Sequence, residues 1–182
     1  MGIFTQHTDI TAPKGSAEVL AKVKARYGFI PNLAAFLAES PVALDAVLSL
    51  VGTFDNTSLT AQEQQLVLLT VSANNDCNYC RTVHVGLGRQ AGIDAGTIKA
   101  TLEAAQLENR KLNALRDLTA ALVEQRGRVE EAKIDAFLSA GYTKAQVFEV
   151  VMGIALKTFT NYCNHLAGAE PNGEFVAMAH AK

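Results

Sequence analysis

The sequence predicts an all-α protein, a helical bundle built as a single domain. Apolar residues recur with the period of a helix in one segment after another, no segment alternates apolar and polar residues over a useful length, and the connections are short. A chain of 182 residues with 49% hydrophobic and 19% charged residues suits one domain with a sizeable core. We expect residues 16–182 to form this domain and residues 1–15, which lack a periodic signal, to form an N-terminal arm.

Residues that favour helix starts and stops divide the chain into its predicted helices. They lie at about residues 16–27, 33–39, 41–54, 61–75, 77–91, 94–105, 108–126, 130–140 and 143–165. The firmest starts are the capping boxes that begin at Thr60 and Thr143. Asp76 is expected to cap the helix that follows it. Pro171 and Gly173 indicate a C-terminal tail without a helix.

Composition excludes several classes of function. A net charge of −2 gives no strong attraction to nucleic acid or to an anionic membrane surface, and the apolar runs are shorter than the roughly 20 residues that cross a bilayer. The N-terminal residues lack the pattern of a secretory signal, so we expect a cytoplasmic protein. Three cysteines are too few for a disulfide framework, and a Cys-x-x-Cys pair in such a chain indicates redox or metal chemistry.

Two of the cysteines lie in the stretch DCNYCRTVH, from Asp76 to His84. Cys77, Cys80 and His84 are three and four residues apart, so they share one face of a helix. A helix N-terminus favours a thiolate, and a protonated His84 would favour it at Cys80. The pattern is typical of a nucleophile, Cys80, with a base, His84, and a resolving thiol, Cys77.

Two other interpretations of the cysteine pair stay open. Free cysteines often serve as small core residues. A Cys-x-x-Cys pair can also be half of a zinc site, but the sequence has no second such pair and no paired histidines to complete four ligands. We therefore expect no metal.

Two glutamates are candidates for proton transfer. Glu149 lies within the apolar run VFEVVMGIAL, where a carboxylate should have a raised pKa or a specific partner. It suits a proton relay and a buried structural contact equally well. Glu63 is the third residue of a capping box, which explains it without a catalytic role.

A short echo hints at an internal repeat. The tripeptide NYC stands at residues 78–80 and again at residues 161–163, each time after a capped helix and before a histidine. If the two helices meet, Asn161, Tyr162 and His165 could form hydrogen bonds near the cysteine pair, although helix capping is the commoner use of such residues. Cys163 is expected in the core.

The stretch LTAQEQQLVLLTVSANNDCNYCRTVHVGLGRQAG resembles the carboxymuconolactone decarboxylase superfamily, specifically its alkylhydroperoxidase D-like members. The flanking GFIPNLAAFLAESP and AGYTKAQVFEVVMGIALKTFTNYCNH resemble its peroxidase-related subgroup, so the similarity covers about residues 28–168. The resemblance implies an all-helical fold and a homo-oligomer, such as a dimer, trimer or hexamer. It also implies reduction of hydroperoxides without a bound cofactor, with electrons from a lipoyl group or a thiol supplied by a partner.

The resemblance also implies roles for individual residues. Cys80 would meet the peroxide, Cys77 would resolve it, and His84 would belong to a proton relay with a glutamate. The position that matches this glutamate holds Gln65, which cannot transfer a proton. Tyr79 also stands where the founding peroxidase has a histidine. Our hypothesis is that Glu149 supplies the missing carboxylate.

The sequence thus predicts a thiol oxidoreductase that reduces alkyl hydroperoxides. A dithiol redox sensor or disulfide reductase would use the same residues. A lyase of the carboxymuconolactone decarboxylase type is a further alternative, although the decarboxylases of the superfamily lack the cysteine pair. The last alternative is a structural oligomer whose cysteines only pack in the core.

Overall fold

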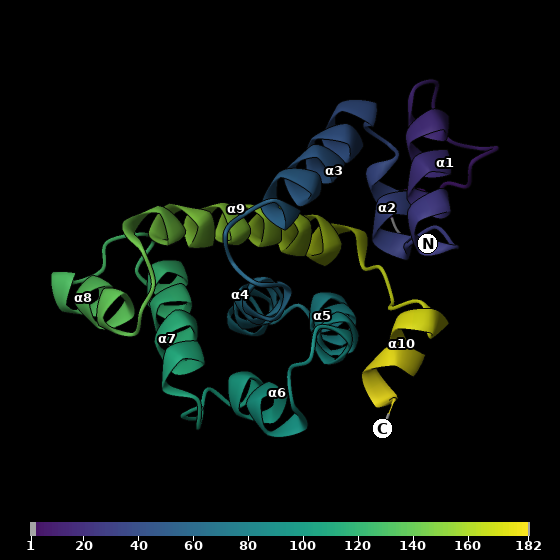
Figure 1. Ribbon diagram of the computed structural model, residues 1–182. Helices are drawn as coiled ribbons and strands as arrows, with labels where there is room; N and C mark the ends of the chain where they lie inside the picture. The colour runs from purple at the N-terminus through teal and green to yellow at the C-terminus, as the bar shows by residue number, and fades with distance from the viewer. Residues whose placement is uncertain (1–2, 182) are drawn as a thin grey trace.

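The computed structural model describes residues 3–181, which form ten helices and no strand (Figure 1). The predicted all-α fold is confirmed. The helices are α1 (Ser16–Tyr27), α2 (Asn32–Leu37), α3 (Pro41–Asp55), α4 (Ala61–Asn74), α5 (Asn78–Gln90), α6 (Ala95–Leu102), α7 (Arg110–Glu124), α8 (Glu131–Ser139), α9 (Lys144–Ala167) and α10 (Gly173–His180).

Most helix starts follow from local sequence signals. Thr60 and Thr143 each accept a hydrogen bond from the backbone three residues on, and the side chain at that position bonds back, so both predicted capping boxes are present. The prediction for Asp76 is wrong. Asp76 has a φ of 53°, and its carboxylate pairs with Arg81 at 2.6 Å. Cys77 therefore stands at the N-cap of α5.

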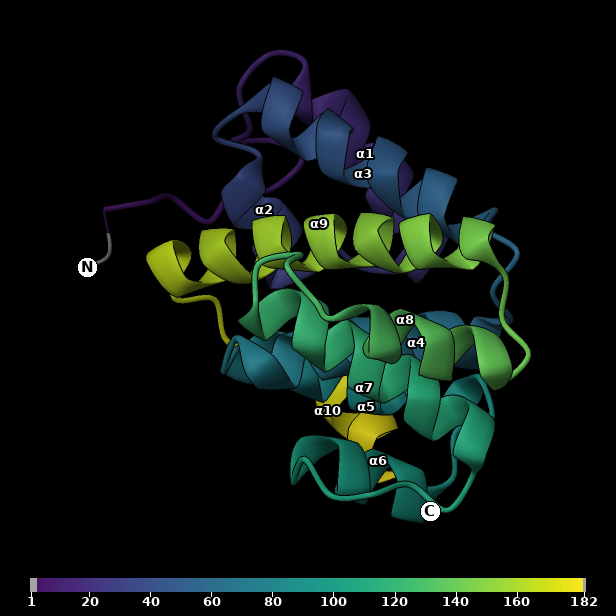
Figure 2. The ribbon, with the colours of Figure 1, turned by 90° about the vertical axis from the view of Figure 1, so that its left-hand side faces the viewer.

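Helix α9 occupies the middle of the bundle. In Figures 1 and 2, α1, α2 and α3 lie on one side of it, and α4 and α7 lie on the other. A close approach at Gly153 makes this packing possible. A Cβ atom at Gly153 would lie 2.8 Å from the ring of Phe54 on α3 and 2.9 Å from Val67 on α4. The fully buried Leu66, Leu69 and Val150 belong to the same core.

The C-terminal segment corrects the sequence prediction, because residues 173–180 form α10 rather than a tail. This helix packs closely on α5, where a Cβ atom at Gly86 would lie 2.8 Å from the Cβ atom of Met178. Phe175 is buried, and its ring centre lies 5.1 Å from that of Phe29. A helix of two turns has too few residues to show a clear apolar period, which explains the error.

The predicted N-terminal arm contains no helix over residues 3–15, and Met1 and Gly2 lie outside the described residues. It lies against α2 and the turn that follows. The backbone N–H of His7 donates to the carbonyl of Ala35 at 3.1 Å, and that of Thr5 donates to the carboxylate of Glu39 at 2.9 Å. The boundary between arm and domain stays a prediction.

The two NYC tripeptides have different surroundings. The chain bends after α4, so residues 78–80 begin a new helix, whereas α9 continues unbroken through residues 161–163. Tyr79 is buried and Tyr162 is 57% exposed. The two segments do meet, because Asn75 Nδ2 donates to Asn161 Oδ1 at 3.0 Å. The two segments therefore share a preceding capping box and a mutual contact, but they differ in helix geometry.

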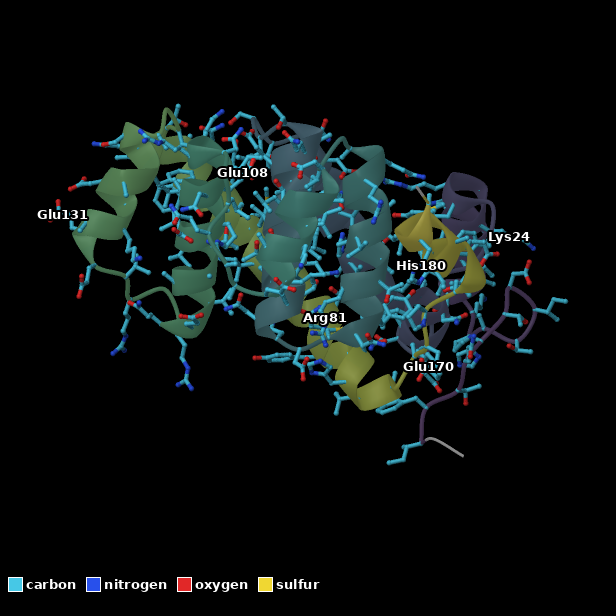
Figure 3. All side chains as sticks on the ribbon, turned by 90° about the horizontal axis from the view of Figure 1, so that it is seen from below. Lys24, Arg81, Glu108, Glu131, Glu170 and His180 are labelled. Atoms are coloured by element: carbon cyan, nitrogen blue, oxygen red, sulfur yellow. The ribbon has the colours of Figure 1, made fainter. Side chains whose placement is uncertain are left out.

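Charged side chains lie around the outside of the bundle, as Figure 3 shows for Glu131 at one end and Lys24 and His180 at the other. Between residues 3 and 181, no helix combines the length and the apolar character needed to span a bilayer.

Candidate active site: a buried dithiol

The two cysteines meet at the start of α5. Cys77 is the N-cap residue, and Cys80 lies in the first turn of the helix. Both are free thiols, with exposed fractions of 0% and 1%, and they are hydrogen-bonded to each other. This arrangement places a nucleophile and a second thiol within reach of one another.

The two thiols have very different pKa values. The hydrogen bond with Cys77 is the main reason that the pKa of Cys80 falls to about 6, and the positive charge of Lys157 and the side chain of Asn161 lower it further against the opposing effect of burial. The same hydrogen bond, together with burial, raises the pKa of Cys77 well above its usual range. At neutral pH, Cys80 is therefore the thiolate and Cys77 is the thiol that donates to it.

Lys157 is the residue that the sequence interpretation missed. It lies on α9, is only 6% exposed, and its charge acts on Cys77, Cys80 and His84. Its position in the helical period of α9 is the signal that could have identified it. The other buried residues of this helix include Val150, Gly153, Thr160, Asn161 and Asn164, and position 157 falls on the same stripe.

Asn161 lies one turn after Lys157 and is completely buried. Its Oδ1 accepts the hydrogen bond from Asn75, and within the described structure its Nδ2 has no oxygen partner. The amide N–H groups are therefore free to point at the Cys80 sulfur, in agreement with the lowered pKa of that thiol.

His84 is neutral in this site. Its Nδ1 lies 2.9 Å from Oε1 of Gln65, and because an amide oxygen only accepts, Nδ1 carries the proton and Nε2 is left unprotonated. Burial, and then the charge of Lys157, lower the pKa of His84 well below its usual value. The cation beside Cys80 is thus Lys157 rather than the protonated His84 that the sequence suggested.

Glu149 does not take the place of the missing carboxylate. Its carboxylate accepts hydrogen bonds from the backbone N–H and the hydroxyl of Ser58, at 3.1 and 2.8 Å, in the loop before α4. Gln65 holds the position next to His84. Along α9, residue 149 lies beside the start of α4, whereas Lys157, two turns further on, reaches the histidine.

Glu63 does not contact His84 either. Its carboxylate accepts from the backbone of Thr60 in the capping box and pairs with Lys111 at 2.8 Å. The structural role predicted for this glutamate agrees with these contacts.

A cavity of about 280 Å³ lies beside the thiol site, between α1, α2, α3, α4, α5, α9 and α10. Most of its wall is apolar, and its polar lining includes a group made of Gln65, His84, Lys157 and Thr160. Arg26 and Asp55 also line it, form an ion pair at 2.6 Å, and are about half exposed. The exposed pair marks the mouth, and the buried polar group marks the inner end.

Over residues 3–181, no three or more His, Cys, Asp or Glu side chains cluster so that they could hold a metal ion. The dithiol and its basic neighbours thus form the candidate site.

Comparison with known proteins agrees with the fold. The model of the carboxymuconolactone decarboxylase family matches residues 39–116, which include Cys77, Cys80 and His84. This part of the chain is therefore similar to the carboxymuconolactone decarboxylase family. No curated protein matches the sequence.

Solved structures show that this chain has the alkylhydroperoxidase D-like fold. A peroxidase-related protein with an alkylhydroperoxidase core from Ralstonia eutropha JMP134 has a TM-score of 0.86 and 21% identity, over 98% of this chain and 96% of that one. A peroxidase-related protein from Silicibacter sp. TM1040 has a TM-score of 0.78 and 20% identity, over 91% and 88%.

A third similar structure is a cysteine-to-alanine variant of the debrominase Bmp8 in complex with 2,3,4-tribromopyrrole. Its TM-score is 0.81 and its identity 16%, over 98% of this chain and 96% of that one. At these identities, the three structures support the fold alone.

Proposed function

We propose that this protein is a thiol oxidoreductase that reduces organic hydroperoxides with Cys80 and Cys77. The observation that carries the proposal is the pair of buried free thiols at the start of α5, supported by the lowered pKa of Cys80 and the raised pKa of Cys77. A peroxidase of this kind needs one thiolate to attack and one protonated thiol to resolve. The apolar cavity beside the site suits an organic peroxide.

The reaction proceeds in three steps. The Cys80 thiolate attacks the terminal peroxide oxygen, the O–O bond breaks, and the alkoxide takes up a proton to leave as an alcohol, which oxidises Cys80 to a sulfenic acid. The Cys77 sulfur then attacks Cys80, and the sulfenic oxygen leaves as water with the Cys77 proton. A dithiol such as a lipoyl group, or a small thiol, finally reduces the disulfide. The cytoplasm, where thiols are kept reduced, suits this cycle.

The test is a turnover assay with an organic hydroperoxide and a dithiol donor. We expect Cys80→Ser and Cys77→Ser to abolish turnover, and only Cys77→Ser to accumulate a sulfenic acid that a dimedone-type reagent traps. Cys163→Ser is the matched control, because that half-buried cysteine lies on α9 away from the pair and should be dispensable. Equal turnover in all variants would overturn the proposal.

The same assay separates the alternatives. A redox sensor would consume peroxide once per chain rather than catalytically, and a disulfide reductase would act on a disulfide and not on the peroxide. A lyase would keep its activity in Cys80→Ser. A structural role for the cysteines predicts that both thiols are buried, as they are here, and that both react slowly with a thiol reagent at neutral pH.

Reductive dehalogenation is a second candidate, favoured by the similarity to a debrominase seen with a tribromopyrrole. The Cys80 thiolate would attack a halogen, the carbon would take a proton in its place, and Cys77 would displace halide to form the disulfide. Release of bromide from a brominated pyrrole in the presence of a dithiol would support this reaction. No bromide release together with peroxide turnover would exclude it.

We also propose that the chain assembles with copies of itself through α9. Its face opposite Lys157 exposes a stripe of large apolar residues, namely Phe148, Val151, Phe159, Tyr162 and Leu166. Such a continuous patch favours an interface, and one helix can pair with the same helix of a second copy about a two-fold axis. Light scattering should give a dimer or a larger oligomer that Phe148→Glu dissociates. The exposed Ile10→Glu is its control, and a monomeric wild type would contradict the proposal.

A further inference from the structure

Lys157 stands in the site without a carboxylate partner. Its side chain is 6% exposed, and none of the ion pairs within residues 3–181 includes it. Burying an unpaired ammonium group is costly, so a buried lysine normally has a partner of opposite charge. The groups around it on α5 are the thiols of Cys77 and Cys80 and the neutral His84.

Among the described α5 groups on which the charge of Lys157 acts, Cys80 is the one whose pKa is low enough to carry the opposite charge at neutral pH. Tyr79 stays a neutral phenol because burial raises its pKa, and from α4 the site receives only the amide of Gln65. Lys157 and Asn161 lie four residues apart, so they approach the same sulfur from one face of α9. Lysine and thiolate thus form a buried pair.

We propose that Lys157 is a catalytic residue: its ammonium group pairs with the Cys80 thiolate and then protonates the alkoxide that leaves during peroxide cleavage. This inference rests on the proposed hydroperoxide reduction. Lys157 lines the cavity together with His84, and its charge also acts on Cys80, so one group can serve both the sulfur and a molecule in the cavity. Lys157 thus takes the role that a histidine and a carboxylate would have in a proton relay. Gln65, which lies beside His84 where that carboxylate would be, cannot transfer a proton.

The proton balance of the cycle closes with this assignment. Attack by the thiolate moves negative charge from the Cys80 sulfur to the leaving oxygen, and Lys157 gives up one proton to form the alcohol. Disulfide formation releases water with the proton of Cys77 and leaves Lys157 neutral. Two-electron reduction by a dithiol delivers two protons, one of which returns to Cys77 and the other to Lys157, beside the restored thiolate.

The pairing also affects the disulfide. A group that stabilises the thiolate stabilises the reduced protein, and a stabilised reduced form makes the disulfide a stronger oxidant. Removal of the Lys157 charge should therefore make the disulfide harder to reduce, whether or not a peroxide is the natural substrate.

The experiment compares Lys157→Met, which keeps the length and loses the charge, with Lys157→Arg, which keeps the charge. Lys99→Met, on the exposed face of α6, is the matched control. In a Cys163→Ser background, the ultraviolet absorbance of the thiolate reports the titration of Cys80, and equilibration with glutathione reports the stability of the disulfide. Circular dichroism and thermal melting identify the variants that fold.

In Lys157→Met, we expect the titration midpoint of Cys80 to rise by about one to three pH units, as for loss of an opposite charge. At pH 7 the ratio [GSH]²/[GSSG] that half-reduces the disulfide should rise about five- to tenfold, and kcat with an organic hydroperoxide should fall about tenfold. Lys157→Arg should recover most of the titration shift. An unchanged midpoint and kcat in a folded Lys157→Met would overturn the proposal.

The outcomes also separate this inference from the proposed function. If the wild type does not turn over peroxide, the hydroperoxide reaction and the alkoxide step both fail, whereas a raised midpoint in Lys157→Met would keep the lysine–thiolate pair. If Lys157→Met does not fold, Lys157→Gln supplies the same comparison. Peroxide turnover with an unaltered midpoint would leave the function and remove the role of Lys157.

Discussion

Glu149 and Lys157 make an instructive comparison, because both are ionisable residues in the apolar middle of α9. The Glu149 carboxylate is half-buried and held by Ser58, whereas Lys157 is buried beside Cys80. A step of eight residues moves about 12 Å along a helix and turns it by about 80° beyond two full turns. Position along α9 and helical phase, and not the apolar surroundings in the sequence, therefore decide which charge reaches the thiol.

Reversal of the charge at Lys157 should have the largest effect on activity. Lys157→Glu places a second anion beside the Cys80 thiolate, which should raise the pKa of Cys80 above neutral. We expect kcat for hydroperoxide reduction at neutral pH to fall about a hundredfold, which corresponds to roughly 2.7 kcal/mol of barrier. Steady-state kinetics on the folded variant provide the measurement, and activity within threefold of wild type would contradict the importance of the positive charge.

Disruption of the close packing of α9 between Glu149 and Lys157 should destabilise the fold. Gly153 lies between Glu149 and Lys157, and any Cβ atom there meets Phe54 and Val67 at under 3 Å. We expect Gly153→Val to reduce the free energy of unfolding by about 3 kcal/mol through overpacking. Urea denaturation gives the value. Gly52→Ala, whose added Cβ atom meets nothing within 4 Å, is the control and should be neutral or slightly stabilising.

The pH dependence of activity tests the Cys80 thiolate without any mutation. The thiolate is the reactive form, and the pKa of Cys80 is lowered to about 6, so kcat/KM should rise with pH through this value and level off above it. Burial, and then the charge of Lys157, lower the pKa of His84 well below its usual value. Between pH 5 and pH 7 the rate should increase roughly tenfold. A midpoint above pH 8 would show that Cys80 is not activated.

The charge of Glu149 should matter least for activity. Glu149→Gln keeps an oxygen that accepts from Ser58 and removes only the charge, so we expect stability to fall by about 1 kcal/mol or less. Hydroperoxide turnover should stay within about twofold of wild type. A loss of kcat similar to that of Lys157→Met would restore the carboxylate relay and contradict the comparison.

Much of the architecture could be predicted because its signals are local. The caps at Ser40, Thr60 and Thr143 and the helical period of the buried residues specify the helices without knowledge of their neighbours. The reactive face of Cys77, Cys80 and His84 follows from spacing within α5. The identity of the catalytic residues stays a prediction until the variants are measured.

The rest depended on contacts between segments far apart in the chain. Asp76 has the right residue type for a cap, but the bend between α4 and α5 gives it a positive φ and moves the cap to Cys77. The short α10 gains its stability from packing on α5, where Gly86 leaves room for Met178. The charge of Lys157 acts on Cys80 only because α9 packs on α4, which brings together residues 77 positions apart in sequence.

The position of α10 separates two properties that many enzymes tie to the same residues. Phe175 forms part of the cavity wall, and none of the charged or titratable groups around Cys80 comes from this helix. The size of the cavity is thus set partly by the C-terminal end, and the reactivity of the thiol is set by α5 and α9. Changes in the last helix can therefore alter which molecules fit while the chemistry stays the same, which makes this segment the natural place to engineer selectivity.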